Sequence, residues 1–440
     1  HVMGKPVVAA EAFTAVKTSW KESPWTLKDQ GDWAFAAGIN RFVIVTFAHQ
    51  PWLDRAPGMM FAQYGLHWER TQTFWPMVDG YHRYLARCSH LLQQGVTVSD
   101  ILYLTPEGVP HVFRPPTSAL VAAESRLPDK KGYGFDGCSP RILMDRAEVK
   151  DGMVCFPNGT SYRVMVLPEI DTMTPELLAK VTELVKAGAT VIGNPPVQSP
   201  SLSGYPECDD QVKKLSEELW GSRVRPASFA KRPYGNGAVY WGSFKPDGIY
   251  PGYDIAASVL KQMEIREDFT STGPVRYGHR RTEDREIYFI SNRSAEAIEA
   301  ACTFRVGEGR PELWNPVSGA TRPLPRYAQE KGRTTIPMQF AAHQSMFVVF
   351  PRGGAPEEGT EGTEGNFPES KVIATLEGPW EVSFDPEWGG PEKVTFDTLT
   401  DWSQSENDGI KHYSGIATYR TTFTHSPPAT RHSPLYVSLG

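Results

Sequence analysis

The sequence lacks the features that would place it at once in several classes of protein. Its 440 residues contain no apolar run close to the roughly 18 residues that a membrane span requires. The net charge is only -6, so no basic excess indicates a nucleic-acid or anionic-membrane partner. Five cysteines are scattered without CxxC or Cys/His metal spacing, and no EF-hand-like spacing of acidic residues is present. The composition, 40% hydrophobic and 22% charged residues, is that of an ordinary globular protein. The sequence does not indicate its oligomeric state.

Tryptophan, by contrast, is abundant. The chain contains 12 tryptophans, and six of them lie within the first 75 residues. Sugar-binding clefts use aromatic faces beside polar groups, because sugar rings present C–H patches on which an aromatic ring stacks. A carbohydrate ligand and a tryptophan-rich core are equally good interpretations of this composition alone.

The first 96 residues show the pattern of a βαβ unit followed by a long helix. Two apolar segments, "PVVAAEAF" and "INRFVIVTFAHQP", read as parallel strands buried on both faces. Between them "TLKDQGDWAFAAG" is compatible with a helix that Gly38 ends. Apolar residues at three- and four-residue spacing then predict an amphipathic helix from Met77 to Leu92, stopped by Gly95.

Four further regions follow from changes in pattern. Residues 97–272 alternate strands and helices, with a helix opened by Thr174 and Pro175, which predicts an open α/β sheet. Residues 273–352 contain short strands typical of a small β-sandwich. Residues 353–370 are rich in Pro, Gly and Glu and are expected to be a linker. Residues 371–440 begin a second β-domain that the chain leaves unfinished, so we expect a fragment cut at both ends.

Glu11 directly follows the first apolar segment, where a carboxylate is costly unless it is paired, hydrated or catalytic. In a β/α barrel, active sites form at the carboxyl ends of the strands. The second strand ends in "TFAHQPW", which places His49, Gln50 and Trp52 at the same predicted mouth. A helix cap or a structural salt bridge is the alternative role for Glu11.

The segment "GLHWERTQTFWP" supplies a second group of candidates, His67, Trp68, Glu69 and Arg70. Glycoside hydrolysis needs two carboxyl groups on either side of the bond that breaks. Glu11 and Glu69 are the two glutamates on the candidate mouth loops, and the His, Gln, Trp and Arg side chains are the candidate substrate-binding groups. A surface loop with an internal Glu69–Arg70 or Glu69–His67 interaction is the alternative.

The blocks "AEAFT", "GDWAFAAGINRFV", "TFAHQPW", "YGLHWERTQTFWP", "DILYLTPEG", "ELWNPVSG" and "LEGPWEVSFDPEWGGP" together resemble glycoside hydrolase family 106, the α-L-rhamnosidase-like enzymes. The resemblance implies a (β/α)8 barrel, of which residues 1–96 would be the C-terminal, catalytic portion. A glutamine-amidotransferase-like α/β domain, a β-sandwich and a partial galactose-binding-like jelly roll would follow.

The same resemblance implies inverting, calcium-assisted removal of terminal α-L-rhamnose from polysaccharides or glycosides, in the periplasm or outside a bacterium. Glu11 would be the base that activates water, and the acid would lie upstream of His1, so the chain alone would hold an incomplete site. A non-catalytic carbohydrate-binding protein and an exo-glycosidase for another neutral or deoxy sugar remain alternatives. In the amidotransferase-like segment "ATVIGNPPVQSP", Asn194 and the two following prolines stand where that family keeps its nucleophilic thiol, so we expect no such chemistry.

Overall fold

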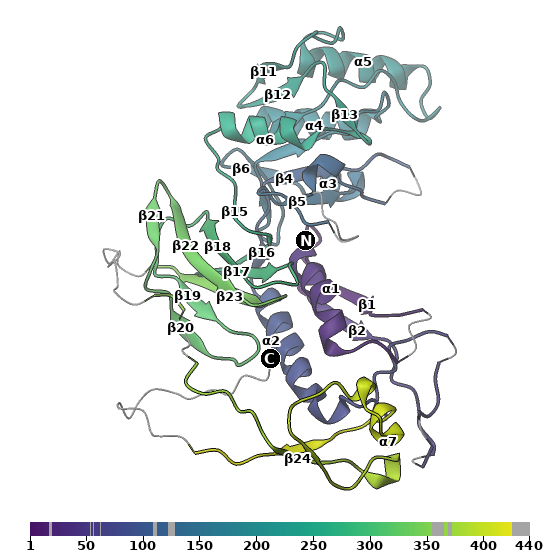
Figure 1. The fold of residues 1–440 in the computed structure, drawn as a ribbon. Coiled ribbons are helices and arrows are strands. Elements are labelled where there is room, and N and C mark those ends of the chain that lie inside the picture. The colour runs from purple at the N-terminus through teal and green to yellow at the C-terminus, as the bar shows by residue number, and fades with distance from the viewer. Residues whose placement is uncertain are drawn as a thin grey trace. The chain divides into compact units, whose positions relative to one another are not determined.

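A computed structural model describes residues 1–16, 20–52, 54–55, 57–61, 63–108, 112–121, 128–353, 365–367 and 372–424 (Figure 1). The chain divides into two compact units, and each is described by itself. The first unit comprises His1–Ala48, Met60–Trp68 and Met77–Pro368, and the second comprises His49–Met59, Glu69–Pro76 and Glu369–Gly440. Most of the predicted linker at 353–370 lies outside the described residues.

The first unit opens with the predicted βαβ unit. β1 (Ala9–Ala12) pairs in parallel with β2 (Arg41–Ile44), and α1 (Pro24–Ala37) connects them. Gly38 ends α1 with φ of 109°, a backbone conformation that side chains rarely adopt, and this confirms it as the helix stop. The amphipathic helix α2 (Val78–Leu92) is also confirmed, although it ends at Gln93 before Gly95 is reached.

The prediction that both strands are buried on both faces is wrong. Phe42 and Ile44 of β2 pack into a core that contains Phe35 of α1. The opposite face stays open, and Val43 on it is 52% exposed. β1 and β2 form a sheet of only two strands among the described residues, so α1 covers one face and nothing comparable covers the other.

A six-stranded sheet follows, with five parallel strands and β11 antiparallel at its edge. In spatial order its strands are β11 (Ala230–Tyr234), β12 (Gly237–Trp241), β10 (Thr190–Ile192), β9 (Val164–Val166), β4 (Ile101–Leu104) and β5 (Phe135–Cys138). Its helices are α3 (Pro140–Arg146), α4 (Pro175–Ala187), α5 (Glu207–Trp220) and α6 (Tyr253–Gln262). Helices cover both faces, because β4 sends Leu102 and Leu104 into a core with α4 and α5, and Ile101 and Tyr103 into a core with α6.

The predicted N-cap of α4 is confirmed, because the Thr174 hydroxyl accepts a hydrogen bond from the Leu177 amide. Two small sheets accompany this region. They are β6 (Glu148–Lys150), β7 (Met153–Cys155) and β8 (Ser161–Tyr162), and the pair β13 (Pro246–Asp247) and β14 (Tyr250–Pro251).

Two antiparallel sheets then face each other across a shared apolar core. One contains β15 (Phe269–Ser271), β18 (Ile298–Phe304), β22 (Arg333–Phe340) and β21 (Ala328–Glu330). The other contains β20 (Thr321–Pro323), β19 (Glu312–Trp314), β23 (Ser345–Pro351), β17 (Arg285–Asn292), β16 (Val275–Arg281) and β3 (Val96–Thr97). Tyr288 and Ile290 of β17 point into the core between the sheets, while Ile287 and Phe289 alternate outward against α1 and α2.

The second unit contains the described residues after 371 and two loop segments from earlier in the chain. Its sheet consists of β25 (Val394–Phe396), β24 (Trp380–Ser383) and β26 (Thr418–Arg420), beside the short helix α7 (Asp408–Lys411). Val382, Phe384 and Ile410 form its buried core. The short 3-10 helices of the chain are η1 (Trp75–Met77), η2 (Thr117–Ala119), η3 (Pro386–Trp388) and η4 (Trp402–Gln404).

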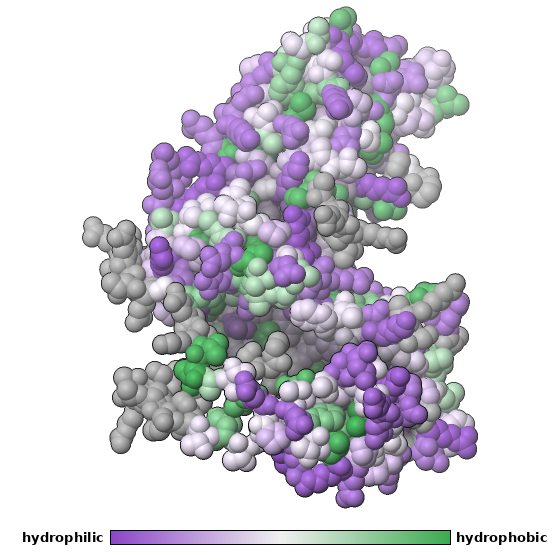
Figure 2. Space-filling view, viewed as in Figure 1, coloured by the Kyte–Doolittle hydropathy of each residue, from purple (hydrophilic) through white to green (hydrophobic). Residues whose placement is uncertain are grey.

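Within the described ranges, no helix is long and apolar enough to cross a membrane. On the face shown in Figure 2, hydrophilic residues dominate and apolar residues are scattered among them. Single exposed apolar residues of this kind are normal on a globular surface and mark no particular partner.

Candidate functional site

Glu11 lies on the open face of the β1–β2 pair, near the carboxyl end of β1. It is paired in register with the exposed Val43, whereas its neighbours Ala10 and Ala12 are paired with Phe42 and Ile44 on the face that packs toward α1. Its carboxylate accepts a hydrogen bond from the Thr14 hydroxyl at 2.6 Å. The alternatives of a helix cap or a salt bridge find no support among the described contacts, in which Thr14 is the partner of this carboxylate.

A chain segment from further along lies against the same strand ends. The Gly65 amide donates to the Ala15 carbonyl at 3.1 Å, and the Trp68 amide donates to the Thr46 carbonyl at 3.1 Å. His67 and Trp68 therefore lie beside the carboxyl ends of β1 and β2. The His67 ring stacks on Trp20, with ring centroids 4.3 Å apart.

Trp68 is buried, and this limits what it can offer a ligand. It is 4% exposed, and its indole N–H donates to the His82 ring at 2.8 Å. His67 is also buried, at 7% exposed. Substrate binding by His67 and Trp68 stays a prediction, because burial leaves little of either side chain exposed to a ligand.

The second unit contains the remaining candidates, which are Glu69, Arg70, His49, Gln50 and Trp52. Glu69 is 1% exposed, and its carboxylate accepts hydrogen bonds from the Thr71 amide at 2.9 Å and from the Thr71 hydroxyl.

Arg70 and Gln50 hold the loops of the second unit together. Arg70 donates to the Gln50 carbonyl at 2.6 Å, while the Gln50 amide group is bonded to both the N–H and the carbonyl of Met59 at 2.7 and 2.8 Å. Trp52 is 52% exposed, with the Arg55 guanidinium 5.3 Å from its ring, and His49 is exposed as well. Trp52 and His49 thus keep surface for a ligand, whereas Gln50 uses its side chain on backbone.

The adjacent parallel pairing of the two strands is confirmed, but a common mouth for all eight candidates stays a prediction. Sequence reasoning missed Thr14 and Trp20, which contact Glu11 and His67. Thr14 had a detectable signal, because it lies three residues after Glu11 in the same short segment.

A metal site is not evident in the part of the chain that the structure describes. No group of three or more His, Cys, Asp or Glu side chains there could hold an ion. Calcium therefore stays an expectation from the family resemblance, without a cluster of these side chains among the described residues to hold it.

Asn194 stands where an amidotransferase would keep its nucleophilic thiol, and its side chain holds neighbouring parts of the domain. Asn194 lies two residues after β10, donates to the Glu169 carboxylate at 2.9 Å and accepts from the Gly242 amide at 3.0 Å. All five cysteines are free thiols. Burial raises the pKa of Cys138, at the end of β5, to about 12, so this thiol is not activated as a nucleophile.

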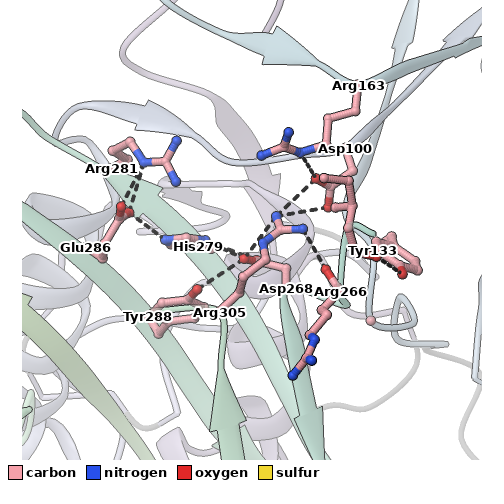
Figure 3. A network of polar contacts seen from close by, with 12 residues as sticks. Asp100, Tyr133, Arg163, Arg266, Asp268, His279, Arg281, Glu286, Tyr288 and Arg305 are labelled. Atoms are coloured by element: carbon pink, nitrogen blue, oxygen red, sulfur yellow. Dashed lines mark hydrogen bonds and ion pairs between the residues drawn. The ribbon is translucent and has the colours of Figure 1, made fainter. Parts of the chain in front are cut away.

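A dense network of titratable side chains is buried elsewhere in the first unit (Figure 3). The two ring nitrogens of His279 bind Asp268 at 3.0 Å and Glu286 at 2.9 Å, and the ring stacks on Tyr288 at 3.8 Å. Arg305 joins Asp268 to Asp100, which lies just before β4.

The two carboxylates that contact His279, Asp268 and Glu286, are held in the charged form. Against the effect of burial, His279 and its cationic neighbours lower the pKa values of Asp268 and Glu286 to about 2. These side chains are paired with one another, and the contact between Arg305 and Asp100 ties the paired β-sheets to the six-stranded α/β sheet.

Comparison with known proteins identifies the family of this chain. The chain belongs to the glycoside hydrolase 106 family, described as alpha-L-rhamnosidase, whose sequence model matches residues 1–329. This confirms the resemblance found in the sequence.

Two relatives illustrate the family. The chain is 36% identical over 352 residues to a protein of Formosa agariphila provisionally named beta-glucuronidase. These 352 residues make up 80% of this chain and 27% of that protein. It also matches the structure of a rhamnosidase from Novosphingobium sp. PP1Y with a TM-score of 0.81 and 30% identity, over 95% of this chain and 38% of that one. The chain therefore spans about a quarter to two fifths of the length of these relatives.

Proposed function

We propose that this chain is part of a glycoside hydrolase that removes terminal α-L-rhamnose from polysaccharides or glycosides by an inverting mechanism. The observation that carries the proposal is the position of Glu11. It lies near the carboxyl end of a parallel strand, on the face away from α1, and its one described partner is the Thr14 hydroxyl. In a β/α barrel that face is the interior, and that end carries the chemistry.

In this proposal Glu11 acts as the general base. Its carboxylate takes a proton from water as the water oxygen attacks the anomeric carbon and the bond to the leaving oxygen breaks. A carboxylic acid on the other side of the sugar gives its proton to that oxygen, and the configuration at the anomeric carbon inverts. The hydrogen bond from Thr14 orients the carboxylate without neutralising it.

Glu69 is the second carboxyl group that the sequence offers. Both hydrogen bonds from Thr71 hold its orientation within its own loop. It is the candidate acid of this chain, and an acid from another part of the protein is the alternative. Calcium and a periplasmic or secreted location remain proposals that rest on family resemblance.

A second candidate function is hydrolysis of another sugar, and the name of the Formosa agariphila relative supports it. Barrels exchange substrates by changing loops, so a shared strand end does not fix the sugar. A carbohydrate-binding protein without catalysis is the remaining alternative.

One experiment separates these candidates. The full-length protein is incubated with an aryl α-L-rhamnoside and, separately, with an aryl β-D-glucuronide, and NMR follows the anomer first released. We expect release of β-L-rhamnose from the rhamnoside. Release of α-L-rhamnose would refute the inverting mechanism, turnover of the glucuronide alone would favour the second candidate, and no turnover of either would refute both.

A further inference from the structure

A pocket in the first unit lies away from Glu11. It is a cavity of about 430 Å³ lined by Arg87, His90, Leu91, Trp314, Asn315 and Phe347, among others. Its size falls in the range of small-molecule sites in proteins. None of the candidate residues from the sequence lines it.

The pocket exists because a sheet is wider than the helices that cover it. Trp314 of β19 is paired with Phe347 of β23 and with Thr321 of β20, so these three side chains share one face of the sheet. Further along the sheet, α1 and α2 cover this face and bury Phe289. At the β19–β20 edge of the sheet, only the last turns of α2 cover this face. Trp314 is therefore partly exposed there, in the same pocket as His90.

The rim of the pocket is fixed in advance. The Asn315 side-chain carbonyl accepts from the amides of Val317 and Ser318 at 2.9 and 3.2 Å. Arg87 of α2 donates to the carbonyls of Pro316 and Val317 at 3.0 and 2.5 Å. A turn held this way loses little conformational entropy when a ligand binds.

The chemistry of the lining favours a neutral sugar ring. Trp314 and Leu91, which are both partly exposed, offer an aromatic and apolar wall on which C–H groups stack, whereas Phe347 is fully buried. Among the contacts of the described residues, the His90 ring and the Asn315 side-chain NH2 group have no hydrogen-bond partner, so both remain available to hydroxyls. Arg87 is already bonded to two carbonyls, so it offers a weak attraction for a charged ligand.

The pocket cannot be part of the Glu11 site. The carbonyl of Leu92, at the end of α2, accepts from the Asn40 side chain at 3.2 Å, and Asn40 precedes β2. The pocket residues of α2, 86 to 91, therefore lie toward the amino ends of β1 and β2. Glu11 lies toward the carboxyl end of β1.

We propose that this pocket is an accessory binding site for a neutral sugar unit, which would hold a carbohydrate chain on the protein away from the catalytic carboxylate. The choice of sugar as the ligand class rests in part on the proposed function. The pocket itself is independent of Glu11.

The test is binding of L-rhamnose and of a neutral rhamnose-containing oligosaccharide, measured by saturation-transfer NMR and calorimetry on the full-length protein. All variants carry Glu11→Gln so that hydrolysis does not interfere. We expect Trp314→Ala to weaken oligosaccharide binding about 10-fold or more and His90→Ala to weaken it about 3-fold. Trp25→Ala is the matched control, since Trp25 is 62% exposed on α1 and outside the pocket, and it should bind like the parent.

His90 is exposed, so His90→Ala keeps the test valid even where Trp314→Ala lowers stability. Unchanged binding in the His90 and Trp314 variants, or no binding by the parent, would overturn the accessory site. Hydrolysis of the aryl rhamnoside by the unmodified protein is measured separately, so loss of the accessory site would leave the proposed function standing.

Discussion

Glu11 and Glu286 are both strand glutamates of the first unit, but they differ in burial and in the number of their hydrogen-bond partners. Glu286 of β17 is 6% exposed and binds His279, Arg281 and Arg352. Glu11 of β1 is exposed and accepts from a single hydroxyl. A carboxylate whose lone pairs are all used by cations cannot accept a proton from water without breaking the structure. The comparison teaches that the free carboxylate, and not the most heavily paired one, is the candidate for chemistry.

The largest effect on stability is expected at the centre of the paired network. His279→Asn removes the cation between Asp268 and Glu286 and leaves two buried carboxylates short of a partner. We expect the free energy of unfolding to fall by about 3–5 kcal/mol, as measured by urea denaturation.

The matched control for this variant is His90→Asn on the surface of α2. It should change the same free energy by less than about 0.5 kcal/mol. Equal effects of the two substitutions would mean that the buried network does not stabilise the fold.

The next effect is the dependence of stability on pH. Burial acts to lower the pKa of His279, but Asp268 and Glu286 raise it above its ordinary value. The stabilisation that charged His279 gives the fold is therefore complete below its pKa in the unfolded chain, ~6.5, and is lost as the pH rises through its pKa in the folded protein. The pKa values of Asp268 and Glu286 are lowered to about 2. The stabilisation that these two carboxylates give the fold is therefore present above their pKa in the unfolded chain, at most ~4.3, and is lost as the pH falls toward 2.

The network should therefore stabilise most between about pH 4.5 and 6.5. Thermal unfolding of the parent and of His279→Asn across pH 3 to 9 checks this. Two parallel curves would contradict the assignment of this pH dependence to His279.

The smallest effect is expected at Thr14. Thr14→Val keeps the shape of the side chain and removes the 2.6 Å hydrogen bond to Glu11. Since Thr14 is exposed, stability should change by less than about 0.5 kcal/mol. We expect kcat for the aryl rhamnoside to fall roughly 3- to 10-fold with KM nearly unchanged, because the carboxylate loses the hydrogen bond that orients it. A rise in KM alone would show that Thr14 contacts the sugar instead.

Local patterns in the sequence predicted much of the fold. The helix ends at Gly38 and Thr174 follow from short-range backbone chemistry, and the βαβ order follows from alternating apolar segments. The half-open sheet did not follow, because the exposure of Val43 depends on which elements pack on each face.

The candidate site was predicted in part. The position of Glu11 near the carboxyl end of a parallel strand followed from its place after an apolar segment, and its catalytic role stays a prediction. The use of Gln50 to hold Met59 depends on loop geometry that no local pattern encodes. The buried network was missed entirely. Arg305 and Asp100 are 205 positions apart, and their contact exists only after the two sheet regions have packed together.

The most direct test of this account compares Glu11→Gln with Glu286→Gln in the full-length protein. Each variant is assayed for kcat on an aryl α-L-rhamnoside and for the free energy of unfolding. Glu11→Gln should lower kcat about 10²- to 10⁴-fold and leave stability within about 0.5 kcal/mol of the parent. Glu286→Gln should lower stability by about 1–3 kcal/mol and leave kcat within a few-fold. A Glu11→Gln variant that keeps its kcat and loses stability would contradict the account, because it would make Glu11 a structural carboxylate like Glu286.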